Sequence, residues 1–158
     1  MSNSRIRSEG TEMTRLEAEK VAMESLAGSV ASYLTSEFSR VELEYKAAGP
    51  VQEATLRAVR PDETTTSFRM PDVFDASEDL RAAMYRPDSG TWLSMRMTVS
   101  AAGSVDASFN YDELPPTSFD FRPGAYATDL LKYPRDPSHI PIWLSEKLEE
   151  FGKMKDSQ

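Results

Sequence analysis

The clearest alternation of apolar and polar residues lies between Thr91 and Glu113, where two extended segments flank a short turn. The first segment has its apolar residues at Trp92, Leu93, Met95, Met97 and Val99. The second alternates between apolar Val105, Ala107, Phe109 and Tyr111 and polar Asp106, Ser108, Asn110 and Asp112. Such alternation places one set of side chains on the core face of a sheet and the other set opposite. Gly103 can adopt the positive φ that a short loop often needs, so we predict the central hairpin of the sheet here.

A long amphipathic helix and a second hairpin are predicted in the N-terminal half. From Thr14 to Phe38, apolar residues recur at helical spacing, and Thr14 with Glu17 has the spacing of a capping box. The pattern changes to alternation from Arg40 to Ala47 and again from Val51 to Arg60, as is typical of strands. Because Gly49-Pro50 between them favours a turn, these two strands should pair as a hairpin.

Shorter helices are predicted in the middle and at the C-terminus. Asp75 should open the first, because Glu78 three residues later completes another capping-box spacing. The second should follow Pro123 and run from Gly124 to Lys132, since proline is favoured in a first helical turn. The last should run from Ile142 to Phe151 and be capped by Gly152.

These elements together predict an α+β fold. We expect an antiparallel sheet built from two hairpins, packed against the long N-terminal helix, with the short helices placed around it. At 158 residues the chain is long enough for one domain with a substantial core, which we place at residues 11–152. Residues 1–10 and 153–158 are expected to be disordered.

Composition narrows the class of partner. The chain has 26 acidic and 18 basic residues and a formal net charge of -8, so it should repel nucleic acid and anionic membranes and favour a basic protein. Acidity of this size is also explained by solubility alone. Apolar runs are too short to span a membrane, and the absence of cysteine fits a reducing compartment, so we expect a cytoplasmic protein.

No catalytic signature is found in the sequence, and we expect no enzymatic activity and no cofactor. His139 is the only histidine, and no residue near it in sequence forms a recognisable catalytic partner. Glycine-rich phosphate loops and a G-x-S-x-G motif are absent. The carboxylates Asp106, Asp112, Glu113 and Asp120 lack the spacing of a calcium loop, so no metal site is expected.

The polar side of the second extended segment indicates that the chain binds a protein partner. Asp106, Asn110 and Asp112 share that side, and Glu113 follows at its end. If no helix covers them, they form an exposed acidic strip in the middle of the sheet that suits a basic partner, with Tyr111, Trp92 or Phe119 as an aromatic anchor. The candidate contact residues are therefore Asp106, Asn110, Tyr111, Asp112 and Glu113. A solvated sheet face without any partner is the alternative.

Residues 80–148 resemble a known family. The matching pieces are Met84-Tyr85, Gly90-Thr91-Trp92, Phe109-Asn110-Tyr111-Asp112, Asp129-Leu130, Tyr133-Pro134-Arg135-Asp136 and Ile140-Pro141-Ile142-Trp143-Leu144. As a set they are similar to the YezG-like immunity proteins, the antitoxins of bacterial polymorphic toxin systems, of an actinobacterial type. The resemblance implies a small cytoplasmic α+β protein without catalysis that binds one cognate toxin domain and occludes its active site.

Two other functions stay open at this point. A curved sheet under a long helix can enclose an apolar pocket, so a small-ligand-binding cup lined by Met95, Met97 and Phe109 is one alternative. A secretion chaperone or adaptor without inhibitory action is the other. The sequence does not decide between a monomer and a homodimer formed by the long helix.

Overall fold

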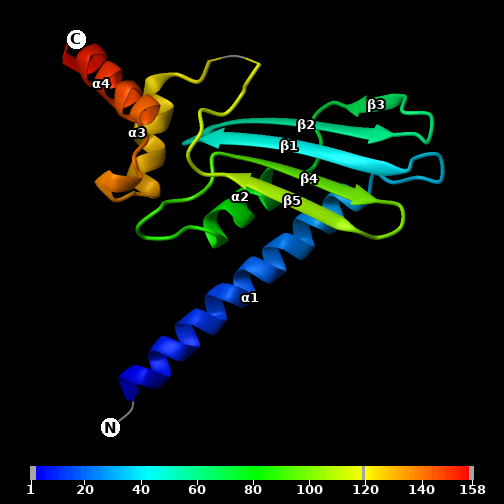
Figure 1. The fold of residues 1–158 in the computed structure, drawn as a ribbon, viewed down its shortest axis with the longest axis horizontal. Coiled ribbons are helices and arrows are strands. Elements are labelled where there is room, and N and C mark those ends of the chain that lie inside the picture. Colours follow the sequence, from blue (N-terminus) through cyan, green and yellow to red (C-terminus); the bar gives the residue numbers. More distant parts are fainter. Residues whose placement is uncertain (1–2, 119, 157–158) are drawn as a thin grey trace.

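Two hairpins and one short strand form a five-stranded antiparallel sheet in the order β3-β2-β1-β4-β5 (Figure 1). The computed structural model describes residues 3–118 and 120–156, with side chains from Thr14 onward. The strands are β1 (Arg40–Ala48), β2 (Val51–Val59), β3 (Thr65–Phe68), β4 (Ser94–Ser100) and β5 (Val105–Asn110). Both predicted hairpins are present, whereas the short strand β3 was not among the predicted elements.

The hairpin of β4 and β5 was predicted to be central, but it forms one edge of the sheet. The middle position belongs to β1, which pairs with β2 on one side and with β4 on the other. In this register Leu43 of β1 lies opposite both Leu56 and Met97. Local alternation predicts each strand and its buried face, but the order of strands depends on pairings between distant segments.

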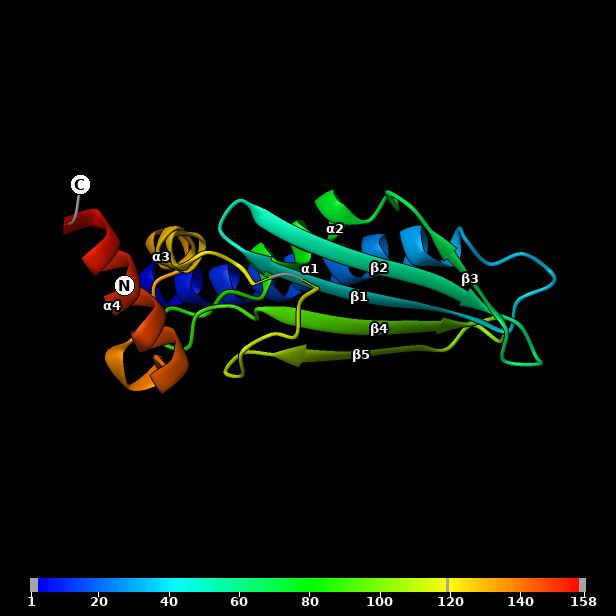
Figure 2. The ribbon, with the colours of Figure 1, turned by 90° about the horizontal axis from the view of Figure 1, so that it is seen from above.

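The helices lie on one face and at one end of the sheet. Over the described residues they are α1 (Asn3–Ala31), α2 (Phe74–Ala83), α3 (Pro123–Lys132) and α4 (Ile142–Asp156), with a short 3-10 helix at Pro137–His139. Helices α1 and α2 cover the same sheet face, while α3 and α4 pack together beside the turn between β1 and β2 (Figures 1 and 2). None of the described helices combines the length and the apolar character needed to cross a membrane. The predicted α+β fold is therefore confirmed.

The predicted helix boundaries were less accurate. Helix α1 begins at Asn3 and ends at Ala31, so Thr14 lies inside it and is not its cap. Helix α4 continues through Gly152 to Asp156, so Gly152 is not a C-terminal cap. The structure gives helical backbone to residues 3–10 and 153–156, where disorder was expected, whereas residues 1–2 and 157–158 lie outside the described residues.

Helix α2 also begins differently from the prediction. Its N-cap residue is Val73, without a capping side-chain hydrogen bond, so the capping box of Asp75 and Glu78 does not form. The Glu78 carboxylate instead accepts hydrogen bonds from the hydroxyl groups of Tyr45 (3.3 Å) and Tyr133 (3.2 Å). Glu78 therefore contacts distant elements of the fold instead of capping its own helix.

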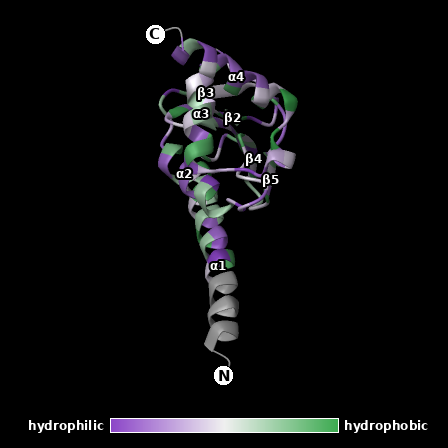
Figure 3. Ribbon diagram, turned by 90° about the vertical axis from the view of Figure 1, so that its left-hand side faces the viewer, coloured by the Kyte–Doolittle hydropathy of each residue, from purple (hydrophilic) through white to green (hydrophobic). Residues whose placement is uncertain are grey.

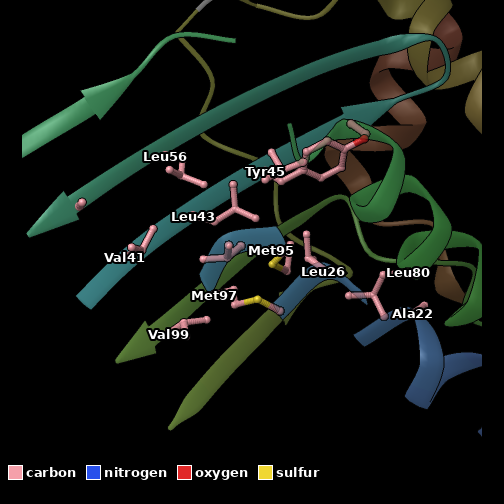
Figure 4. Close-up of a cluster of buried hydrophobic side chains, with 14 of the residues drawn as sticks. Ala22, Leu26, Val41, Leu43, Tyr45, Leu56, Leu80, Met95, Met97 and Val99 are labelled. Atoms are coloured by element: carbon pink, nitrogen blue, oxygen red, sulfur yellow. The ribbon is translucent and has the colours of Figure 1, made fainter. Parts of the chain in front are cut away.

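The main core fills the space between the sheet and the two helices that cover it (Figure 4). Leu26 of α1 and Leu80 of α2 lie with Leu43, Met95 and Met97 of the sheet, all at most 2% exposed. Trp92, two residues before the start of β4, is also fully buried and packs against Tyr45 and Phe109. The methionines proposed above as the lining of a ligand cup therefore belong to the packed core.

Leu26→Ala should lower the free energy of unfolding by about 2–5 kcal/mol, because the substitution leaves a cavity among fully buried side chains. Val21→Ala on the same helix removes a side chain that is 64% exposed, and should change stability by no more than about 0.5 kcal/mol. Urea denaturation followed by circular dichroism measures both. Equal, small effects would show that α1 is not packed on the sheet as described.

A buried ion pair connects the helices on the sheet face to those at its end. The Arg81 guanidinium on α2, which is fully buried, donates to both carboxylate oxygens of Asp129 on α3 at 2.7 Å. It also donates to the Trp92 carbonyl at 2.7 Å. Asp129 in turn accepts the backbone N–H of Gly49 at 2.9 Å. Gly49 has φ +57°, and a Cβ there would lie 2.7 Å from the Ala125 carbonyl oxygen, so this close approach requires glycine.

Candidate functional site

The sheet face opposite α1 and α2 is covered by charged and polar side chains of both signs. On β1 and its neighbours, ion pairs join Arg57 to Glu42 (2.9 Å) and Arg96 to Glu44 (3.2 Å). The hydrogen bond from Arg57 lowers the pKa of Glu42, so this carboxylate stays ionised over a wider pH range. These arginines share the open face with the polar side of β5. The predicted acidic strip in the middle of the sheet is thus replaced by a mixed-charge surface.

Residues 111–118 and 120–122, which we term the crossing loop, pass over part of this open face (Figures 1 and 2). Phe119, named above as an alternative anchor, lies outside the described residues. In the middle of the loop, the Ser118 N–H donates to the Glu53 carboxylate of β2 at 3.1 Å. At its end, Phe121 is buried against Tyr126 and Leu144 in a second hydrophobic cluster. A hollow of about 250 Å³ lies where the loop meets the sheet, and Lys46, Arg96 and Glu113 are among the residues that line it.

Asn110 has a structural role at the start of the crossing loop. Its side-chain oxygen accepts the N–H of Glu113 at 2.9 Å, and its side-chain nitrogen donates to the carbonyl of the same residue at 2.9 Å. The same nitrogen also donates to Ser94 Oγ on β4 at 2.9 Å. Asn110 therefore shapes the turn that presents Asp112 and Glu113, and its polar groups face the protein.

Tyr111 and Asp112 are held mainly through their backbone. The Tyr111 carbonyl accepts a hydrogen bond from Arg135 at 2.5 Å, and the Asp112 carbonyl accepts one from Trp143 Nε1 at 2.7 Å. The Tyr111 ring is partly buried against the main core. The Asp112 carboxylate is 72% exposed and lies 3.4 Å from Arg135. Of these two candidates, Asp112 is the one whose charged group faces solvent.

Arg135 is the residue that positions this part of the loop. Its side chain is only 2% exposed, and besides Tyr111 it donates to the carbonyls of Thr91 (3.1 Å) and His139 (3.0 Å). Burial lowers the pKa of Arg135, although Asp112 partly opposes the shift. Gly90, at φ +76°, leaves room for it, because a Cβ there would lie 2.6 Å from Arg135 Cγ. No local pattern in the sequence singles out Arg135 for this role, because its acceptors are backbone carbonyls of other segments.

Not all five predicted contact residues come together. Asn110, Tyr111, Asp112 and Glu113 form the start of the crossing loop, whereas Asp106 pairs with Thr98 near the other end of β5. Asp106 and Asn110 are four residue steps apart along the strand, which corresponds to about 13 Å. Asp106 and Glu113 are both exposed. The candidate binding surface is therefore the crossing loop with the open face beside it, and Asp106 lies apart from it.

The groups considered above for catalysis or metal binding do not gather. In the part of the chain that the structure describes, no cluster of three or more His, Asp or Glu residues has the geometry to hold a metal ion. His139 ends the short 3-10 helix, and its carbonyl is an acceptor for Arg135. Tyr133, beside Glu78, has a pKa raised to about 12 by burial and by that carboxylate, so its hydroxyl stays protonated and donates.

Comparison of the chain with protein-family models finds no match, and comparison with curated proteins finds no related sequence. Function must therefore be inferred from the geometry of the candidate surface together with the resemblance of residues 80–148.

Proposed function

We propose that this chain is an immunity protein, which binds one cognate bacterial toxin domain and blocks the toxin's active site. The observation that carries the proposal is the crossing loop, a fixed segment that presents charged and apolar side chains beside an uncovered sheet face. The family resemblance includes the start of this loop, within Phe109 to Asp112, and also Arg135 and Trp143, which hold it.

The chemistry of the loop suits a protein partner. Leu114 is 47% exposed, and the exposed carboxylates of Asp112, Glu113 and Asp120 lie on the same loop. An apolar contact within a polar rim is the usual composition of a protein interface. Anchoring by Arg135 and Trp143 limits the entropy that the loop loses on binding, which favours affinity.

The mechanism that we propose is occlusion. The net charge of -8 steers the chain towards a basic toxin domain and raises the association rate. Contacts by Leu114, Asp112 and Glu113 then determine the dissociation rate. This role requires no chemistry from the chain itself, only a complementary surface that lies over the toxin's active site.

Replacing both Asp112 and Glu113 with lysine should weaken binding to the toxin domain and reduce the salt dependence of the affinity. The matched control replaces Asp75 and Asp79 with lysine, because both are exposed on α2, which lies on the helix-covered face. Each pair changes the net charge equally, so the control isolates position from total charge. Isothermal titration calorimetry at low and high salt measures both. Unchanged affinity of the loop variant at every salt concentration would contradict this placement.

A further inference from the structure

The two edges of the sheet differ in length and regularity. Among the described strands, β3 forms one edge with four residues, and β5 forms the other with six. The register of β5 on β4 is unbroken from Val105 opposite Val99 to Asn110 opposite Ser94. Strand β5 contains no proline and no lysine, two residues that natural proteins use to protect an edge from pairing with another chain, and Asp106 is its single charged residue. It is therefore a regular edge that can accept another strand.

The hydrogen-bonding groups that β5 offers at this edge follow from its register. At the hairpin end, the Ser100 N–H donates to the Ser104 carbonyl at 3.0 Å, and hydrogen-bonded pairs alternate along β4 and β5 from there. The N–H and carbonyl groups of Asp106 and Ser108 accordingly face β4. Those of Val105, Ala107 and Phe109 face away from it, towards the position of an added strand.

The sequence of β5 is complementary to itself in the antiparallel direction. When two copies are paired about Ala107, Val105 of each lies opposite Phe109 of the other, and Asp106 lies opposite Ser108. All three outward-facing residues then form hydrogen-bonded pairs, apolar side chains meet apolar ones, and no like charges are opposed. We propose that β5 binds β5 of a second copy, which gives a two-fold dimer with one continuous sheet.

The position of helix α1 also favours a second copy of the chain as the partner of β5. It crosses the helix-covered sheet face and emerges past β5, and the first of its coloured turns in Figure 3 extend beyond the rest of the protein (Figures 1 and 3). Side chains 14–18 are all exposed, including Leu16 at 59%. Val105, on the same side of β5, is 45% exposed. In the dimer, each α1 extends towards the helix-covered face of the other copy, so it gains the tertiary packing that a helix in water otherwise lacks.

The dimer leaves the candidate binding surface accessible. Its two-fold axis is perpendicular to the sheet, so the open faces of both copies lie on the same side. Because each chain carries a net charge of -8, the copies repel each other, and dimerisation should strengthen as salt screens this repulsion. Binding of a basic toxin shows the opposite salt dependence, so the two interactions are distinguishable.

Sedimentation equilibrium of the full chain, over a range of protein and salt concentrations, tests the proposal. We expect a species of twice 17.7 kDa, favoured by salt. Ala107→Pro removes an outward N–H without affecting the ladder with β4, and should raise the dimer dissociation constant about tenfold or more. Ser67→Pro is the matched control, because the register of β3 on β2 places its N–H outward at the opposite edge. It should leave dimerisation unchanged.

Charged variants test the pairing about Ala107 even if the proline variant fails to fold. Ala107→Lys and Ala107→Asp should each be monomeric, because each places two like charges opposite one another across the axis. Mixed in equal amounts, the two variants should form a heterodimer. A wild-type chain that stays monomeric at all concentrations and salts would overturn the proposal. So would a dimer that all the Ala107 variants leave intact, or a mixture that remains monomeric.

Discussion

Asp129→Ala is expected to lower the free energy of unfolding by about 3–5 kcal/mol, because it leaves the buried Arg81 guanidinium without its carboxylate. Arg81 would keep its hydrogen bond to the Trp92 carbonyl, but its charge would be uncompensated in the interior. The Gly49 N–H would lose its acceptor as well. Since these bonds join α2, α3 and the turn between β1 and β2, urea denaturation should show a large shift of the midpoint.

Two further variants test whether the loss of stability comes from the unpaired charge of Arg81. Replacing Arg81 with Met and Asp129 with Leu together removes both charges, so it should recover much of the lost stability. Arg96→Gln breaks an ion pair with Glu44 in which Arg96 is 73% exposed, and should cost no more than about 1 kcal/mol. If Asp129→Ala costs no more than Arg96→Gln, the pair does not hold these elements together.

Arg135→Lys is expected to lower the free energy of unfolding by about 2–4 kcal/mol although it preserves the charge. The guanidinium donates to the carbonyls of Thr91, Tyr111 and His139 at once, and an ammonium group on a shorter side chain cannot reproduce that geometry. Residues 111–114 should lose protection from hydrogen exchange before the sheet does. Mass spectrometry of peptides from the crossing loop measures this directly.

The carboxylate nearest to Arg135 provides the control for this prediction. Asp112 is 72% exposed and 3.4 Å from the guanidinium, so Asp112→Asn should change stability by no more than about 1 kcal/mol. It should also leave the exchange of the loop nearly unchanged. If Asp112→Asn releases the loop as strongly as Arg135→Lys, the ion pair and not the carbonyl contacts positions it.

The sequence predicted the elements better than their arrangement. Alternation in β1, β2, β4 and β5 depends on which face of each strand is buried, and this is a local property. The edge position of β5 was missed because it depends on β1 pairing with β4 across about fifty residues of chain. Helix ends were missed for a related reason: the spacing of Asp75 and Glu78 fits a cap, but tertiary contacts use Glu78 elsewhere.

The candidate site shows the same limit. Alternation placed Asp112 and Glu113 at the end of the second segment, where both are exposed, but it did not indicate that Asn110 would shape the turn below them. The residue that fixes the loop, Arg135, lies more than twenty positions away and reaches the Tyr111 carbonyl only in the folded chain. Sequence patterns report side-chain chemistry, and such contacts with backbone carbonyls leave no periodic signal.

Growth of a bacterial host that expresses the toxin domain encoded in the neighbouring gene, with and without this chain, tests the proposed function most directly. We predict that the chain restores growth and co-purifies with the toxin domain, and that the variant with lysine at positions 112 and 113 restores growth less well. Toxicity that persists beside well-folded wild-type chain would contradict the assignment as an immunity protein.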